Sequence, residues 1–179
     1  MKRRINPIYD FLTFLELISV MRRSDCDIVH TNSTKAGVLG SIAGKLCGKK
    51  VVYTAHGLFI LEQQPKLYRW FYILIEKFTS LFRDKIISVS EHDKTLLIKN
   101  RIAKIEKVIT IYNGIDPIDF MEPSAAKLEL GISSNYFTIG TITRLQHLKG
   151  NDVLIKAVKL LSPEALAKVK LIIIGDGTE

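Results

Sequence analysis

Two cationic side chains, Arg144 and Lys149, lie five residues apart in the stretch FTIGTITRLQHLKGNDVLIKAVKLL, residues 137–161. The stretch begins as an apolar strand and continues as an amphipathic helix, so both cations belong to the turn between them. A guanidinium can bind two phosphate oxygens, whereas an ammonium adds a mobile point charge. The free N–H groups at the start of the helix, next to Gly150, favour the same ligand. The turn therefore indicates a diphosphate site, although ordinary solvated loop cations would show the same spacing.

The elements around this turn predict an α/β fold with parallel sheets, because strands and helices alternate along the chain. The first part is expected to hold helices over 7–23, 34–46, 65–82 and 91–99, and strands over 27–31, 50–55, 85–90 and 108–112. The second part is expected to hold strands over 136–142 and 169–174, with a helix over 150–161 between them. Right-handed crossovers bring the carboxyl ends of parallel strands to one edge of a sheet, where ligands bind.

A polar stretch with Pro117 and Pro123 interrupts this alternation. We predict a first domain over residues 1–113, a linker over 114–134 and the start of a second domain over 135–179. The second domain is expected to be incomplete, because two strands are fewer than the roughly four to six of an ordinary sheet.

The composition is that of a globular protein with a basic first part. Of the 179 residues, 47% are hydrophobic, which is enough for a packed core. The net charge is +8, and residues 1–110 hold 19 Lys/Arg against 10 Asp/Glu. Nucleic acid, anionic lipid headgroups and phosphorylated substrates would each fit this charge. No recognisable nucleic-acid motif accompanies it, so we expect no nucleic-acid partner.

The sequence offers no signal for membrane spanning or for a metal. No apolar run reaches the roughly 20 residues that cross a bilayer, and no signal-peptide pattern occurs, so we expect a cytoplasmic protein. Cys26 and Cys47 have neither a second Cys nor a His at zinc-ligand spacing, and the four histidines share no such spacing. We expect no metal and no cofactor.

The predicted helix over 65–82 mixes aromatic and basic side chains, among them Tyr68, Trp70, Phe71, Lys66 and Arg69. Such a helix could lie on an anionic membrane, as a peripheral protein on the inner face of the plasma membrane would require. Packing of the aromatic side chains into the domain core is the alternative.

Further polar residues follow the predicted strands at the ligand edge. His56 and Gly57 close the strand over 50–55, and a neutral imidazole there can hydrogen-bond a hydroxyl, unless the histidine is structural. Thr34 and Lys35 follow the strand over 27–31, where Ser33 or Thr34 could simply cap the next helix. Two other strands end in Asn113-Gly114, which on composition is a turn, and in Gly175-Asp176-Gly177.

Six segments carry a family resemblance, and in chain order they are DIVHTNSTKAGVLGSIAGKL, VVYTAHG, IISVSEHDK, VITIYNGID, TRLQHLKG and LIIIGDGTE. They resemble, in the same order, segments of the glycosyltransferases of family 4. TRLQHLKG is similar to the G-R-[LF]-x-x-x-K-G signature of that family. The resemblance spans nearly the whole chain and implies the GT-B fold of two facing Rossmann-like domains, of which this chain would hold an incomplete part.

The resemblance implies roles for the residues of the first domain and of the turn. Arg144, Lys149 and Gly150 would grip the diphosphate of a nucleotide-sugar donor, a UDP- or GDP-sugar, and stabilise the charge on the leaving group. His56 would be the catalytic histidine at the sugar and acceptor side. The residues expected on the acceptor side are Thr34, Lys35 and Gly57.

It also implies roles for the remaining strand ends. Gly175, Asp176 and Gly177 would form the loop near the nucleotide, and Asn113 and Gly114 would lie near the interdomain crossing. One departure is Thr143, which stands where the family usually has Gly and is expected to narrow the turn near the phosphates.

The predicted function is transfer of a sugar, with retention of configuration, from a nucleotide donor to a glycan or lipid-linked acceptor in surface polysaccharide synthesis. Nucleotide-sugar epimerases share the GT-B fold and are one alternative, distinguishable because an epimerase needs no acceptor. A non-catalytic module that binds nucleotide sugars or membranes is the other alternative.

The resemblance also predicts that the chain alone is inactive. Family members run to roughly twice this length. An N-terminal strand would precede this chain, and an E-x7-E segment that binds ribose and sugar would follow Glu179. We therefore expect truncation at both ends and no sugar transfer by the 179 residues in an assay with nucleotide sugar and acceptor. Measurable transfer by this chain would contradict the expectation.

Overall fold

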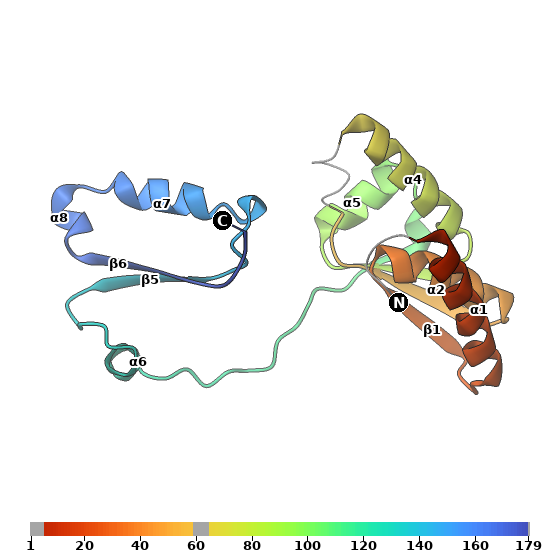
Figure 1. The fold of residues 1–179 in the computed structure, drawn as a ribbon, viewed down its shortest axis with the longest axis horizontal. Helices are drawn as coiled ribbons and strands as arrows, with labels where there is room; N and C mark the ends of the chain where they lie inside the picture. Colours follow the sequence, from red (N-terminus) through yellow and green to blue (C-terminus); the bar gives the residue numbers. More distant parts are fainter. Residues whose placement is uncertain (1–5, 59–64, 179) are drawn as a thin grey trace. The chain divides into compact units, whose positions relative to one another are not determined.

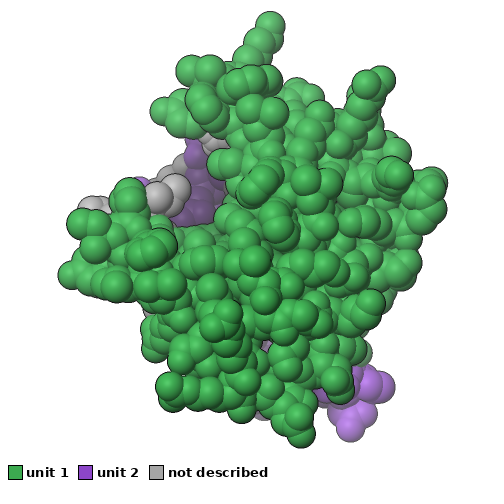
Figure 2. Space-filling model, turned by 90° about the vertical axis from the view of Figure 1, so that its right-hand side faces the viewer, with its two compact units in different colours: residues 1–115 green, residues 116–179 purple. Residues whose placement is uncertain are grey.

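The computed structural model describes residues 6–58 and 65–178. The chain divides into two compact units, unit 1 with residues 1–115 and unit 2 with residues 116–179 (Figure 1 and Figure 2). Each unit is built on a parallel sheet, as the alternation of strands and helices predicts.

Unit 1 contains a four-stranded parallel sheet in the order β1-β2-β3-β4. Its strands are β1 (Ile28–Asn32), β2 (Lys50–Ala55), β3 (Lys85–Ser88) and β4 (Val108–Thr110). Its helices are α1 (Pro7–Arg23), α2 (Thr34–Leu46), α4 (Lys66–Ser80), α5 (Glu91–Lys99) and the 3-10 turn η1 (Ile105–Lys107). All the elements expected in this part are present, and their ends agree with the expectation to within two residues.

The crossover helices lie on one face of this sheet. Consecutive strands are neighbours throughout, so right-handed crossovers carry α2, α4 and α5 to the same side. α2 packs on β1 and β2, and α1 packs on α2. The approach of α2 requires glycine, because a Cβ atom on Gly37 would lie 2.5 Å from the Tyr53 ring.

The interior of unit 1 combines an apolar cluster with a buried ion pair. The cluster includes Tyr53, Leu58, Ile86, Leu97 and Ile102. Beside it, Arg83 Nη1 donates to Glu76 Oε2 at 2.6 Å, and neither side chain is exposed at all.

Two further groups hold the guanidinium of this pair. Arg83 Nε donates to Ser41 Oγ on α2 at 3.2 Å, and Cζ lies 3.7 Å from the centroid of the Tyr53 ring. Burial raises the pKa of the Tyr53 and Tyr72 phenols, so both stay neutral next to the pair. The ion pair therefore links α4 to both α2 and β2.

Helix α4 turns its polar side inward. Glu76, Thr79 and Ser80 are buried, whereas Trp70 and Phe71 are about half exposed. The alternative that the aromatic side chains pack into the core is therefore wrong for most of them, and Tyr72 is the aromatic residue of α4 that is buried. The ion pair explains this orientation, because Glu76 can contact Arg83 only when its side of α4 faces the interior of unit 1.

The ends of the elements follow local capping. β3 ends at Ser88, two residues before the predicted end, because the Ser90 side chain accepts a hydrogen bond from Asp93 N at 3.0 Å and starts α5. At α2 the predicted capping by Ser33 or Thr34 is wrong. Ser33 makes no side-chain capping bond, since its φ of 67° is not the extended conformation that an N-cap adopts.

Unit 2 contains two parallel strands, β5 (Phe137–Ile142) and β6 (Val169–Ile174). Its helices are α6 (Pro123–Glu129), the 3-10 turn η2 (His147–Lys149), α7 (Asn151–Lys159) and α8 (Pro163–Leu166). α7 runs along one face of the strand pair (Figure 1). α6 lies inside the stretch expected to be a linker, and Lys127 Nζ donates to the Tyr136 carbonyl at 2.7 Å. Part of that stretch therefore belongs structurally to unit 2.

The buried pair predicts a specific stability pattern. Replacing Arg83→Met leaves the Glu76 charge buried without its counter-charge and should lower the free energy of unfolding by about 3–5 kcal/mol. The double variant Glu76→Leu with Arg83→Met removes both charges and should be more stable than Arg83→Met alone. Urea unfolding followed by circular dichroism measures both.

The matched control is the exposed pair of Lys45 and Asp84, whose N–O distance is 3.0 Å. Lys45→Ala should cost no more than about 1 kcal/mol, because solvent screens that pair. A loss for Arg83→Met as small as that for Lys45→Ala would show that the buried pair does not determine stability.

Candidate functional site

The turn after β5 presents both cations that indicated a phosphate site. Arg144 follows β5, and Lys149 ends η2, directly before α7. Both side chains are exposed. Neither the guanidinium nor the ammonium is paired with a carboxylate among the residues that the structure describes. The two positive charges are therefore available to an anion.

The turn after β5 is joined to the loop after β6. Leu145 N donates to the Asp176 carbonyl at 2.9 Å, and Thr178 N donates to the Leu145 carbonyl at 2.9 Å. These bonds continue the parallel pairing of the strands beyond Ile142 and Ile174. The structure thus brings the predicted diphosphate residues and the predicted nucleotide-side loop together.

Glycine makes this contact between the two loops possible. A Cβ atom on Gly177 would lie 1.9 Å from the Leu145 carbonyl oxygen, and one on Gly175 would lie 1.8 Å from that of Thr143. The backbone at Gly175 therefore closely approaches the backbone of Thr143, while narrowing of the turn by the Thr143 side chain stays a prediction. Thr143 itself is not among the described non-glycine residues with positive φ, so its side chain costs no backbone strain.

The start of α7 adds hydrogen-bond donors to the turn. Gly150 is the N-cap residue with φ 68°, a left-handed conformation that favours glycine. Its N–H donates to the His147 carbonyl, so the helix offers the N–H groups of the residues after Gly150. Asn151, which the sequence analysis did not single out, is buried, and its Nδ2 has no hydrogen-bond partner among the described residues.

In unit 1 the carboxyl ends of β1 and β2 bring two polar side chains together. His56 Nε2 lies 2.9 Å from Asn32 Oδ1, and both residues are exposed. With the amide oxygen facing the ring, Nε2 carries the proton and donates. The Nδ1 atom of His56 is then left as an acceptor for a hydroxyl group.

The loop that carries His56 is held by a residue that the sequence analysis did not single out. Asp93 on α5 is buried, and its Oδ1 accepts a hydrogen bond from Leu58 N at 2.8 Å. Its Oδ2 accepts from Ser90 Oγ at 2.7 Å. Gly57, with φ 137°, lets the chain turn between His56 and Leu58. The spacing of Ser90 and Asp93, which resembles a capping box, was the signal available in the sequence.

The other residues expected on the acceptor side are engaged within unit 1. Lys35 Nζ pairs with the Asp10 carboxylate on α1, and this hydrogen bond lowers the pKa of Asp10. The Thr34 hydroxyl lies beside the Tyr72 phenol. No described hydrogen bond joins Thr34 or Lys35 to His56 or Asn32. Asn113 and Gly114 follow β4 and are exposed.

Within residues 6–58 and 65–178, no group of three or more His, Cys, Asp or Glu side chains could hold a metal ion. No helix in the described part is long and apolar enough to cross a membrane.

The loop contact in unit 2 predicts the effect of adding one methyl group. Gly177→Ala should lower the free energy of unfolding by about 1–3 kcal/mol, because its Cβ meets a backbone carbonyl that cannot move aside alone. Hydrogen exchange at the Leu145 and Thr178 amides should become faster. Gly140→Ala is the control, since a Cβ atom there meets nothing within 4 Å. Equal exchange in the two variants would contradict the contact.

Comparison with known proteins relates this arrangement to a family. A family model described as Glycosyltransferase Family 4 matches residues 2–118. The UDP-Gal:alpha-D-GlcNAc-diphosphoundecaprenol alpha-1,3-galactosyltransferase of Escherichia coli is 29% identical over 98% of this chain and 47% of that protein. The capsular polysaccharide biosynthesis glycosyltransferase CapM of Staphylococcus aureus is also 29% identical, over 98% of this chain and 47% of that protein. The chain thus spans about half the length of the curated relatives it matches.

The solved structures agree on the fold. The crystal structure of Anabaena Alr3699/HepE in complex with UDP and glucose aligns with a TM-score of 0.75 at 23% identity, over 98% of this chain and 46% of that chain. The predicted α/β fold of GT-B type, with parallel sheets in two parts, is confirmed. Because the family model covers more than half of the residues, the chain belongs to glycosyltransferase family 4.

Proposed function

We propose that the protein takes part in the transfer of a sugar from a UDP-sugar to a lipid-linked sugar acceptor, with retention of configuration. The observation that carries this proposal is the turn after β5, where Arg144 and Lys149 stand beside the loop after β6 in a chain of family 4. The E. coli relative is named for a UDP-Gal donor and a diphosphoundecaprenol-linked acceptor. These names support UDP over GDP and a lipid-linked acceptor over a free glycan.

In the proposed mechanism the residues of unit 2 bind the donor. The Arg144 guanidinium and the Lys149 ammonium hold the two phosphates, and the N–H groups that start α7 add hydrogen bonds to the same oxygens. Negative charge grows on the diphosphate as its bond to the sugar breaks. Both cations stabilise that charge, which lowers the barrier. The loop of Gly175, Asp176 and Gly177 lies on the nucleotide side.

The residues of unit 1 are proposed to orient the sugar and the acceptor. His56 is the catalytic candidate, because its Nδ1 can accept a hydrogen bond from a sugar hydroxyl while Asn32 holds Nε2. Asp93 acts through the backbone of Leu58 and is a positioning residue. Holding the sugar and the acceptor in a reactive geometry lowers the entropic part of the activation free energy.

The names of the curated relatives weigh against the two alternatives. Both relatives described above are called glycosyltransferases and neither is called an epimerase. A protein that binds nucleotide sugars without catalysing a reaction would use the same turn after β5, so this turn alone does not distinguish binding from transfer. Sugar transfer that depends on an acceptor, in a protein that includes this chain, distinguishes transfer from both alternatives.

The donor site predicts how UDP binds. Arg144→Ala should weaken binding of UDP to the 179-residue chain by about tenfold to a hundredfold, because a charge-assisted hydrogen bond to phosphate is lost. Uridine, which lacks phosphate, should bind the variant and the unchanged chain equally. Isothermal titration measures both ligands.

The matched control is Lys159→Ala, which removes an exposed cation at the other end of α7. This variant should keep UDP affinity within about twofold, since the charge lies beyond the reach of the donor turn at ordinary salt. Equal UDP affinity for Arg144→Ala and the unchanged chain would overturn the diphosphate assignment. A product sugar of inverted configuration would overturn retention.

A further inference from the structure

Helix α4 has its apolar side towards solvent, the reverse of an ordinary surface helix. The outer stripe of α4 consists of six side chains, each between 42% and 70% exposed: Leu67, Trp70, Phe71, Leu74, Phe78 and Leu81 at the helix end. Five of them follow spacings of four and three residues and therefore lie on one line along the helix. From Leu67 to Leu81 this line is about 21 Å long.

The buried ion pair keeps this stripe outside. Glu76 lies on the opposite side of α4 and is held by Arg83, so the helix cannot rotate its apolar side inward without exposing or separating the pair. A continuous apolar surface that is kept exposed in this way marks an interaction surface.

One flank of the outer stripe is basic. Lys66, Arg69 and Lys77 lie on the flank that faces α5, and Arg69 Nη2 donates to Asn100 Oδ1 at 3.4 Å. Residues 65–107 hold ten Lys/Arg and five Asp/Glu. The internal pair of Arg83 and Glu76 accounts for one of each, and a second acid, Asp93, is buried. Nine Lys/Arg and three Asp/Glu therefore remain outside these buried positions.

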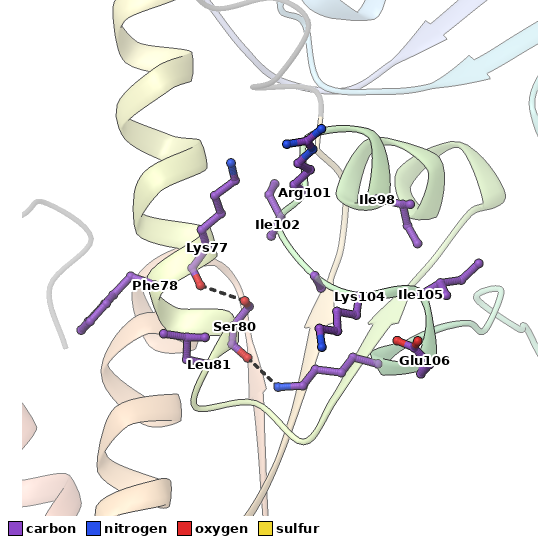
Figure 3. A pocket seen from close by; sticks show the side chains of 12 residues that line it. Lys77, Phe78, Ser80, Leu81, Ile98, Arg101, Ile102, Lys104, Ile105 and Glu106 are labelled. Carbon is purple, nitrogen blue, oxygen red and sulfur yellow. Dashed lines mark hydrogen bonds between the residues drawn. The ribbon is translucent and has the colours of Figure 1, made fainter.

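A pocket of about 810 Å³ joins the outer stripe to this basic flank. Phe78 and Leu81 of the stripe line one side, and Lys77, Arg101 and Lys104 also line it. In Figure 3 the Lys77 and Arg101 side chains extend towards the same end of the pocket, from α4 and from the segment after α5. Glu106 is the acidic residue of the lining.

Another lysine of the pocket lining, Lys107, binds the carboxyl end of α4. Lys107 Nζ donates to the carbonyls of Ser80 at 3.1 Å and Arg83 at 2.9 Å. It thereby satisfies acceptors at the carboxyl end of α4, where a cation is favourable. The other three cations of the lining make no such bond among the described residues.

We propose that the outer stripe of α4 and the adjoining basic pocket dock the protein onto an anionic phospholipid bilayer. The apolar side chains would enter the boundary between headgroups and acyl chains, and the cations would meet headgroup phosphates. A bilayer fits better than a protein partner, because lysine is depleted in protein interfaces while Trp with flanking Lys and Arg is typical of membrane surfaces. The docking does not depend on sugar transfer, since the donor turn contributes none of its residues.

The test uses the 179-residue chain with vesicles of phosphatidylcholine alone or mixed with phosphatidylglycerol. The chain should sediment with the mixed vesicles and much less with phosphatidylcholine alone, and salt should weaken the binding. Trp70 is the only tryptophan of the sequence, so its emission reports the stripe directly. It should shift to shorter wavelength on binding.

Two variants separate the apolar and the basic contributions. Phe71→Ser with Phe78→Ser should weaken vesicle binding about tenfold or more, because two exposed aromatic side chains no longer enter the bilayer. Lys77→Gln with Lys104→Gln should weaken binding to the vesicles that contain phosphatidylglycerol by a similar factor. It should leave binding to phosphatidylcholine vesicles unchanged. Unchanged urea midpoints would show that both variants fold.

The matched control for the aromatic variant is Phe11→Ser with Leu15→Ser, which removes exposed apolar side chains from α1. It should bind within about twofold of the unchanged chain. Sedimentation without a shift of Trp70 emission would mean attraction by charge alone and would overturn the docking of the stripe. A concentration-dependent emission shift without vesicles would identify a second copy of the chain as the occupant instead.

Discussion

The buried ion pair of Arg83 and Glu76 determines how unit 1 is assembled. Charges at this depth are stable only next to each other, so α4 must place its Glu76 side against the rest of the unit. Ser41 on α2 and Tyr53 on β2 complete the surroundings of the guanidinium. One interaction therefore joins two helices and a central strand, and it keeps the apolar side of α4 in solvent.

Both candidate sites are placed by strand register and by backbone contacts. In unit 2 the pairing of β5 and β6 continues into the turn of Arg144 and the loop of Gly177. The two strands therefore fix where the proposed donor-binding residues lie. In unit 1 the loop of His56 is tied to α5 by Asp93. The chemistry proposed for each site thus depends on residues that are distant in sequence and adjacent in space.

The sequence was sufficient for the order and type of the elements, because alternation of apolar residues and helix-start signals are local. The parallel sheets, the GT-B fold and the family followed from that order and from six motif segments. The ends of some elements did not follow from the sequence, since they depend on how the chain turns. Ser90 starts α5 by capping it, whereas Ser33 has a positive φ and its side chain does not cap α2.

What the sequence determined by itself is the set of chemical groups at the strand ends, above all Arg144 and Lys149 in a turn between a strand and a helix. Only the tertiary structure decided which groups face one another. It paired Lys35 with Asp10, placed Asn32 beside His56, and turned the aromatic side of α4 outward. The physical reason is that hydrogen bonds and ion pairs act over a few ångströms, and sequence patterns do not specify which distant residues come that close.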